Sequence, residues 1–84
     1  MVIEKVIPTD KFVRDVKRLR DRKTKERIDV EVKRIRENPD IGKPLGYGLK
    51  GERSVRIPPY RLIYAVIGTN LILLRFEHRD GVYD

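Results

Sequence analysis

Residues 54–78 read SVRIPPYRLIYAVIGTNLILLRFEH, and this stretch decides the fold. Its three apolar runs are rich in β-branched and aromatic residues, which is typical of strands. Two turn signals separate the runs: the stiff Pro58-Pro59 pair, which lacks two backbone donors, and the Gly68-Thr69-Asn70 reversal. Because such short turns join antiparallel neighbours, the stretch predicts three consecutive antiparallel strands. We expect them at residues 54–57, 60–67 and 71–78.

Two arginines flank the Pro-Pro turn. Side chains alternate between the faces of a strand, so Arg56 and Ser54 face away from the apolar Val55. In the same way Arg61 faces away from Leu62. We therefore expect the two arginines side by side, on the sheet face that no helix covers.

The third run delivers polar residues to the end of the sheet. Strict alternation puts Arg75 on the face of Leu73 and puts Phe76 on the opposite face. His78, the only histidine, and Arg79 follow where this strand ends. A buried strand needs no polar cluster at its exit, so these residues are candidates for function.

The N-terminal half predicts one strand and two helices. Residues 2–7 form a short β-rich run that stops at Pro8, and Thr9 or Asp10 then caps a helix. After a charged break at residues 21–24, a second helix runs to Asn38-Pro39. The apolar stripes at helical spacing are Phe12, Val13, Val16 and Leu19, and then Ile28, Val32 and Ile35. Val30 lies off the second stripe and would fit an alternating strand, but the length and the many Lys, Arg and Glu residues favour a helix.

These elements predict an α+β fold of the order βααβββ. Two N-terminal helices pack on one face of a small antiparallel sheet, and the other face stays partly open. Residues 41–51, IGKPLGYGLKG, form a connection with four glycines and a proline. They are not a phosphate-binding loop, because no strand precedes them and no helix follows. With 84 residues, the chain is one domain, residues 1–84.

Composition narrows the classes of function. There is no cysteine and one histidine, which argues against disulfides, metal sites and a metal cofactor, and we expect no cofactor. The first apolar run is broken by Glu4, Lys5 and Pro8, so we expect no signal peptide or membrane span and a cytoplasmic protein. The net charge of +7 favours a polyanionic partner such as nucleic acid. Solubility or a heat-adapted surface is the alternative explanation of this charge.

The C-terminal half resembles the RelE/ParE toxin superfamily, and within it the RelE side, whose members are small basic toxins of toxin–antitoxin pairs. The similarity lies in the order and spacing of GKPL, LKGERSVR, YRLIY and EHRDGVY, read from Gly42. The positions in register are Leu49, Gly51, Ser54, Arg56, residues 60–64, His78, Arg79 and Tyr83. The βααβββ order is also that of the superfamily.

This resemblance implies an endoribonuclease that cleaves messenger RNA in the ribosomal A site. In such enzymes a 2′-hydroxyl attacks the adjacent phosphorus without a metal. A group must take its proton, cations must hold the charge on phosphorus, and an acid must protonate the leaving oxygen. The implied partners are a RelB-like antitoxin, messenger RNA and ribosomal RNA, with no membrane.

The resemblance also suggests roles for five residues. Arg61 matches the phosphate-binding arginine, and the planar fork of arginine can grip two phosphate oxygens. Arg56 matches a basic residue one strand earlier, and Arg79 an arginine near the C-terminus. Tyr83 matches a tyrosine that stacks on a base or handles a proton, and His78 stands where several members have histidine. Histidine can both take and give a proton near neutral pH.

Each candidate also has a plain structural explanation. Arg61 could pair with a surface carboxylate, although an arginine in an apolar strand is costly without a purpose. Arg56 could protect an edge strand. Lys50, Arg53 and Ser54 are candidates for RNA contacts, against the alternative of a solvated loop.

The sequence departs from the superfamily in three ways. Ser54 stands where some members have lysine, and Pro58-Pro59 replaces a glycine-containing turn. No acidic residue matches the base of the histidine-rich branch, although Glu52 and Glu77 are nearby. Two other functions therefore stay open. One is a ParE-like, non-enzymatic toxin that binds DNA gyrase, and the other is an inactive homologue that only binds its antitoxin.

Overall fold

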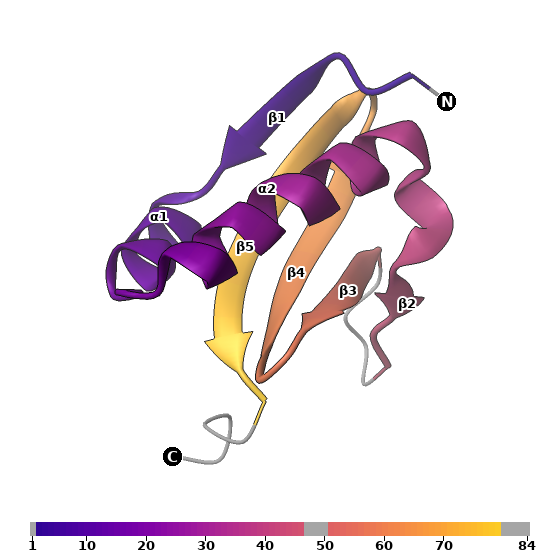
Figure 1. Ribbon diagram of the computed structural model, residues 1–84. Helices are drawn as coiled ribbons and strands as arrows, with labels where there is room; N and C mark the ends of the chain where they lie inside the picture. The colour runs from indigo at the N-terminus through magenta and orange to yellow at the C-terminus, as the bar shows by residue number, and fades with distance from the viewer. Residues whose placement is uncertain (1, 47–50, 80–84) are drawn as a thin grey trace.

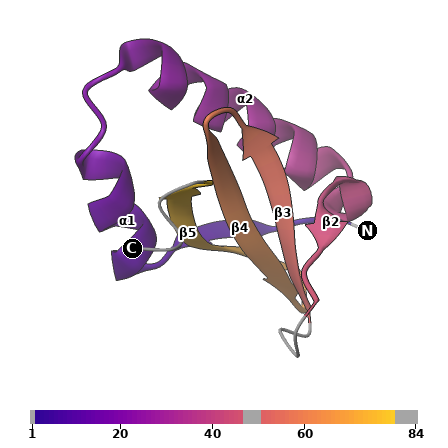
Figure 2. The same cartoon turned by 90° about the horizontal axis from the view of Figure 1, so that it is seen from below.

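The computed structural model of the protein describes residues 2–46 and 51–79. Both helices cover one face of a single sheet, and the other face is open (Figures 1 and 2). The elements are β1 (Lys5–Pro8), α1 (Asp10–Lys17), α2 (Arg22–Glu37), the 3-10 helix η1 (Pro39–Ile41), β2 (Lys43–Pro44), β3 (Glu52–Ile57), β4 (Tyr60–Ile67) and β5 (Asn70–His78). The predicted α+β class and the order of its helices and strands are confirmed. Within residues 2–46 and 51–79, no helix is long and apolar enough to cross a membrane.

The sheet has the strand order β1-β5-β4-β3-β2. Strands β3, β4 and β5 pair antiparallel, as expected, and β2 also pairs antiparallel with β3; β1 lies parallel to β5, so the sheet is mixed and not antiparallel throughout as predicted. The first and last strands of the described chain are thus neighbours (Figure 1). Strand β2 is an addition to the predicted order. It lies in the segment that we expected to be a connection, and its two residues pair with Ser54 and Arg53 of β3.

The core lies between the helices and the covered face of the sheet. Its buried side chains are Ile3, Phe12, Leu19, Ile28, Ile35, Ile57, Leu62, Tyr64, Leu71, Leu73 and Phe76. Val13 was predicted to belong to the buried stripe of the first helix, and this is wrong because it lies exposed beside the buried Phe12. A single helical stripe is too narrow to bury two consecutive residues equally.

Side-chain caps set where the helices begin. The Thr9 hydroxyl accepts the N–H of Phe12 at 3.1 Å, so Thr9 is the cap of α1. Asp21 caps α2 by accepting the N–H of Lys23 at 3.0 Å and the hydroxyl of Thr24 at 2.8 Å. The Thr24 hydroxyl bond and the Lys23 amide bond hold the pKa of Asp21 below its usual value. The charged break expected at residues 21–24 is therefore the capped first turn of α2.

A bulge in β5 changes which residues face the core. Ile63 pairs with Arg75, but the next residue, Tyr64, pairs with Leu73, so Leu74 is the extra residue. The inserted residue reverses the alternation that follows it. The expectation that Arg75 shares the face of Leu73 is wrong, whereas its position opposite Phe76 is as expected. Phe76 lies in the core at 4% exposure, and Arg75 lies on the open face.

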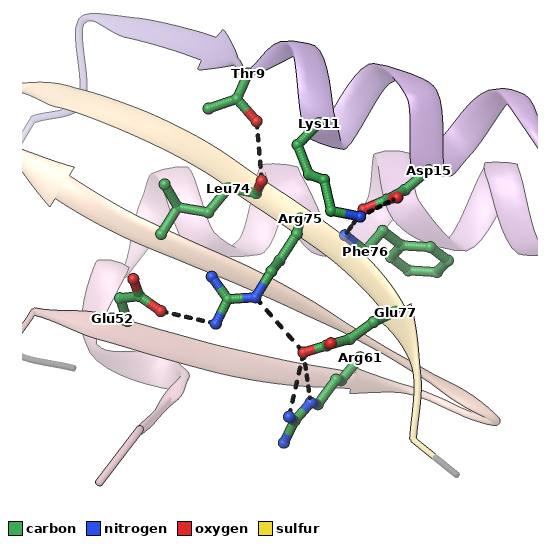
Figure 3. A network of polar contacts seen from close by, with 9 residues as sticks. All are labelled: Thr9, Lys11, Asp15, Glu52, Arg61, Leu74, Arg75, Phe76 and Glu77. Atoms are coloured by element: carbon green, nitrogen blue, oxygen red, sulfur yellow. Dashed lines mark hydrogen bonds and ion pairs between the residues drawn. The ribbon is translucent and has the colours of Figure 1, made fainter. Parts of the chain in front are cut away.

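Beyond the end of β1, polar side chains at the start of α1 and within it form hydrogen bonds with the backbone of β5. The Thr9 hydroxyl donates to the Leu74 carbonyl at 2.9 Å, and the Phe76 N–H donates to the Asp15 carboxylate at 3.0 Å (Figure 3). Asp15 is buried, and its other oxygen pairs with Lys11 at 2.7 Å. Backbone groups that β1 does not reach are thus satisfied by the helix.

Candidate functional site

The two arginines that flank the Pro-Pro turn are direct partners across β3 and β4. Arg56 stands opposite Arg61 in the register. Both face away from the helices, because their neighbours Ile57 and Leu62 are in the core. The prediction that the two arginines lie side by side on the open face is confirmed. Like charges that stand opposite each other repel, so an anion between or beside them is stabilised.

A carboxylate of the protein already binds one of these arginines. Arg61 donates through Nε to one oxygen of Glu77 at 3.2 Å, and its Nη2 lies within ion-pair distance of the same oxygen, also at 3.2 Å. The same oxygen lies 3.6 Å from Nε of Arg75 (Figure 3). The two side chains of the Arg61–Glu77 pair are 30% and 27% exposed, so the pair is accessible from solvent.

The network continues across the sheet to β3. Arg75 bonds Glu52 at 2.9 Å, so Glu52, Arg75, Glu77 and Arg61 form a row of alternating charges (Figure 3). The four charges sum to zero. Arg56 stands next to this row, and no described side chain is within ion-pair distance of its guanidinium. Arg56 is therefore an exposed cation of the open face beside a neutral network.

His78 lies on the other face of the sheet. It is the register partner of Tyr60, and its ring meets the Tyr60 ring edge-on with centroids 5.3 Å apart. Tyr60 in turn stacks on the core residue Phe76 at 4.9 Å. These rings line a cavity of about 420 Å³ under α1, with Lys11 and Arg18 at its rim. His78 therefore does not share a face with Arg61, because Tyr60 and Arg61 are consecutive residues of β4 and point to opposite faces.

Arg79 lies at the same end of the sheet as the arginine pair. Its N–H donates to the carbonyl of Pro59 at 2.9 Å, which fixes its backbone beside the Pro-Pro turn. Its side chain is exposed. The other predicted residue of the tail, Tyr83, lies outside the described residues, as does Lys50.

Comparison with known proteins identifies the family. A profile of the ParE toxins of type II toxin–antitoxin systems, parDE, matches residues 6–83. The chain belongs to this family. It is therefore a toxin of a type II toxin–antitoxin system in the RelE/ParE superfamily, as the sequence resemblance implied. A search of curated protein sequences gave no match.

Solved structures of RelE toxins share the fold of this toxin. The Mycobacterium tuberculosis RelBE2 toxin–antitoxin complex contains a chain 31% identical to it, with a TM-score of 0.77 over 93% of this chain and 100% of that one. The RelB–RelE complex of Methanococcus jannaschii matches at 21% identity and a TM-score of 0.74, over 93% and 95%. A mutant E. coli RelE toxin in the free state matches at 15% and 0.80, over 99% and 90%.

The remaining candidates of the toxin lie on different sides of β3. Arg53 points toward η1, where it donates to the Gly42 carbonyl at 2.7 Å and lies 3.6 Å from the Asp40 carboxylate. It holds η1 against the sheet. Ser54 is half-buried on the open face, opposite Ile63. Ser54 therefore shares a face with the arginine pair, and Arg53 does not.

Sequence reasoning missed the part played by Arg75, Glu77 and Glu52 on the toxin's open face. Strict alternation through LILLRFEH gave the wrong face for Arg75, and Glu77 matched no residue of the superfamily. One signal was available. Phe76 is the one aromatic side chain of this run, so assigning it to the core first puts its two neighbours on the open face.

Proposed function

We propose that this toxin is a ribosome-dependent endoribonuclease that cleaves messenger RNA in the ribosomal A site by metal-independent attack of the 2′-hydroxyl. The observation that carries the proposal is the Arg61 fork, which already holds a carboxylate on a solvent-accessible sheet face. A guanidinium that pairs with a carboxylate, with Nε donating and Nη2 within ion-pair distance, is also suited to phosphate. The exposed cation of Arg56 stands directly opposite it and suits a second phosphate.

The proposed roles follow the positions of the side chains. Arg61 and Arg79 hold the charge that develops on the five-coordinate phosphorus, and Arg56 binds the neighbouring phosphate. Proton transfer belongs to His78 or Tyr83. Because His78 is on the helix side, it can reach the leaving oxygen only if the scissile phosphate sits at the end of β5, next to Arg79.

The RNA-binding residues differ in what they contribute. Ser54 shares the open face and offers a hydroxyl, and Lys50 adds a cation in the neighbouring connection. Arg53 is held by η1, so its contribution is its positive charge alone. The absence of a lysine at position 54 makes the arginines the main cations of the proposed site.

Single-turnover cleavage of a ribosome-bound message tests this function. Arg61→Ala and Arg79→Ala should each slow cleavage by about 100- to 1,000-fold, as removal of one phosphate-stabilising donor does in other enzymes. Arg34→Ala is the matched control, because it removes an arginine that also pairs with a glutamate, Glu31, but on α2. Wild-type rates for both Arg61→Ala and Arg79→Ala would contradict the proposed site.

A second candidate function is inhibition of DNA gyrase by binding alone. The observation that favours it is the family profile, which is that of ParE toxins. A gyrase binder has no need of a phosphate-gripping site, so its activity should survive Arg61→Ala. Supercoiling assays beside the cleavage assay separate the two functions. An inactive homologue that only binds its antitoxin would affect neither.

We also propose a RelB-like antitoxin as the protein partner. The net charge of +7 favours an acidic partner, and relatives are known in complexes with RelB antitoxins. An apolar groove of about 430 Å³ between β1 and α2 offers a place for an amphipathic helix. It is lined by Val6, Pro8, Phe12, Ile28, Val32 and Leu73, with Lys33 and Arg36 among its polar residues. Co-purification with the protein encoded beside the gene tests this. Failure to co-elute at moderate salt would count against it.

A further inference from the structure

We propose that Glu77 occupies the phosphate position of Arg61 in the free toxin, and that an RNA phosphate displaces it there and leaves it with Arg75. This inference rests on the proposed function and names a competitor built into its site. Glu77 is then a positioning residue. It sets how strongly the arginine pair binds an anion, and it takes no part in the chemistry.

The geometry of the pair supports such an exchange. Nε of Arg61 donates to one oxygen of Glu77 at 3.2 Å, and Nη2 lies 3.2 Å from the same oxygen without a hydrogen bond; the second oxygen makes no hydrogen bond with a described residue. A phosphate presents several oxygens, so it can satisfy Nε and Nη2 separately in a parallel, bidentate bond. The phosphate is also favoured by Arg56 on the opposite strand. The pair is about one-third exposed, so an incoming phosphate can reach it.

Glu77 has a second cation to go to. Nε of Arg75 lies 3.6 Å from the oxygen that Arg61 binds, and Arg75 is anchored at its other side by Glu52 at 2.9 Å. Displacement therefore shifts the carboxylate from one arginine to the other. A half-buried carboxylate left without a cation would be costly. The row of alternating charges makes the exchange possible without that cost.

Competition with Glu77 sets a minimum binding strength that an anion needs in order to occupy Arg61. Without Glu77, two opposed arginines would bind a single phosphate or any polyanion. With Glu77 present, a ligand must compete with a carboxylate that cannot diffuse away. An RNA that makes several contacts at once can do so, whereas an isolated phosphate is at a disadvantage.

The first test compares Glu77→Gln with the wild type. The amide keeps the size of the side chain and removes its charge. Inorganic phosphate is titrated while the Nε–Hε signal of Arg61 is followed by NMR. A short, fully 2′-O-methylated RNA, which cannot be cleaved, is the second probe. Affinity for both should rise about fivefold, which corresponds to a surface ion pair at the upper end of its usual range. For the RNA, the log–log salt slope should steepen by about 0.7, since one more cation is released.

Glu4→Gln is the matched control. It makes the same change of charge at the opposite end of the sheet, where Glu4 accepts the hydroxyl of Thr69 at 2.6 Å, a bond that the amide preserves. Its phosphate and RNA affinities should stay at wild-type values. An equal rise in Glu4→Gln and Glu77→Gln would show a general charge effect and overturn the proposal.

Arg75→Gln should change the phosphate affinity in the direction opposite to Glu77→Gln. Without Arg75, Arg61 is the one cation among the described residues that contacts Glu77, so phosphate affinity should fall. In the double variant Arg75→Gln with Glu77→Gln, the affinity should return to the level of Glu77→Gln alone. If Arg75 bound RNA directly, its loss would weaken binding equally with and without Glu77. That result would contradict the exchange.

Cleavage kinetics separate this inference from the proposed function. In a ribosome-bound message, Glu77→Gln should lower KM and leave kcat unchanged, because the side chain acts before the chemical step. A wild-type toxin that does not cleave overturns the proposed function, and the phosphate titration then still decides the exchange. Cleavage by the wild type with an unchanged phosphate affinity in Glu77→Gln overturns the exchange alone. Thermal unfolding of each variant checks that it is folded.

Discussion

At the scale of single residues, Tyr64 joins the sheet to the segment that follows α2. Its ring is fully buried, and its hydroxyl accepts the N–H of Gly42 at 3.0 Å and donates to the carbonyl of Pro39. Both backbone groups belong to the turn around η1. The position of β2, which follows that turn, thus depends on this phenol together with Arg53.

Gly42→Ala should destabilise the toxin by about 1–3 kcal/mol, the usual cost of overpacking a core. A Cβ at Gly42 would lie 2.5 Å from the Tyr64 hydroxyl oxygen and 2.7 Å from a ring carbon. The reason is space, since the φ of Gly42 is an ordinary −72°. Gly46→Ala is the control, because no heavy atom of the described structure lies within 4 Å of its Cβ position. Urea unfolding of both variants measures the difference, and equal stabilities would contradict this packing.

Tyr64→Phe should cost about 1–3 kcal/mol at neutral pH, because two buried backbone groups lose their partner. Burial raises the pKa of the Tyr64 phenol above its ordinary value of 10.0. The unfolded chain therefore loses this proton first, and the stability that the phenol contributes is lost as the pH rises above about 10. Tyr64→Phe should show a smaller loss between pH 9 and 11. Tyr60→Phe, whose hydroxyl makes no hydrogen bond with a described residue, should behave like the wild type.

At the scale of elements, α1 and β5 are joined by polar contacts as well as by packing. Asp15 accepts the Phe76 N–H next to the bulge and pairs with Lys11. Asp15→Ala should therefore cost about 1–3 kcal/mol, because it leaves a buried N–H unsatisfied. Asp15→Asn, which keeps an acceptor oxygen, should cost less. Thermal unfolding compares the two, and an Asp15→Ala protein as stable as the wild type would contradict this role.

The elements that could be predicted from sequence are those with local signals. Turn residues marked the hairpins β3–β4 and β4–β5, an apolar period marked both helices, and a cap marked the start of α1. The parallel pairing of β1 with β5 joins residues 65 positions apart, as in Lys5 with Asn70, and no local pattern encodes it. Strand β2 has two residues in a glycine-rich segment, too few for an alternation to be read.

Sequence patterns predicted the residues of the candidate site that precede the bulge in β5, but not those that follow it. Arg56 and Arg61 are placed by a tight hairpin, so simple alternation predicted their pairing. Beyond Leu74 the alternation shifts by one residue, and LILLRF is apolar at both faces, so its sequence does not reveal the shift. Arg75 was therefore assigned to the wrong face, and the Glu77 carboxylate on Arg61 was missed.

At the scale of the whole molecule, the excess of positive charge acts on stability. The toxin carries +7 within extents of 33 × 29 × 21 Å. At 0.01 M salt the screening length is about 30 Å, so every charge acts on every other one, whereas at 1 M it is about 3 Å and only charges in contact interact. Repulsion among like charges opposes the compact state. The ion pairs of the open face have their partners in contact, so salt weakens them less.

Added salt should therefore stabilise the free toxin. We expect a rise of about 1 kcal/mol in the free energy of unfolding between 0.01 and 0.5 M sodium chloride, or roughly 4–8 °C in Tm for a domain of this size. Arg14→Glu, on the exposed side of α1 next to Lys11, Lys17 and Arg18, lowers the net charge by two and should make this dependence weaker. Thermal unfolding across a salt series measures both slopes. Salt screens both the ion pairs and the long-range repulsion. A Tm that falls with salt would therefore mean that the ion pairs contribute more to stability than the repulsion removes, and would contradict the prediction.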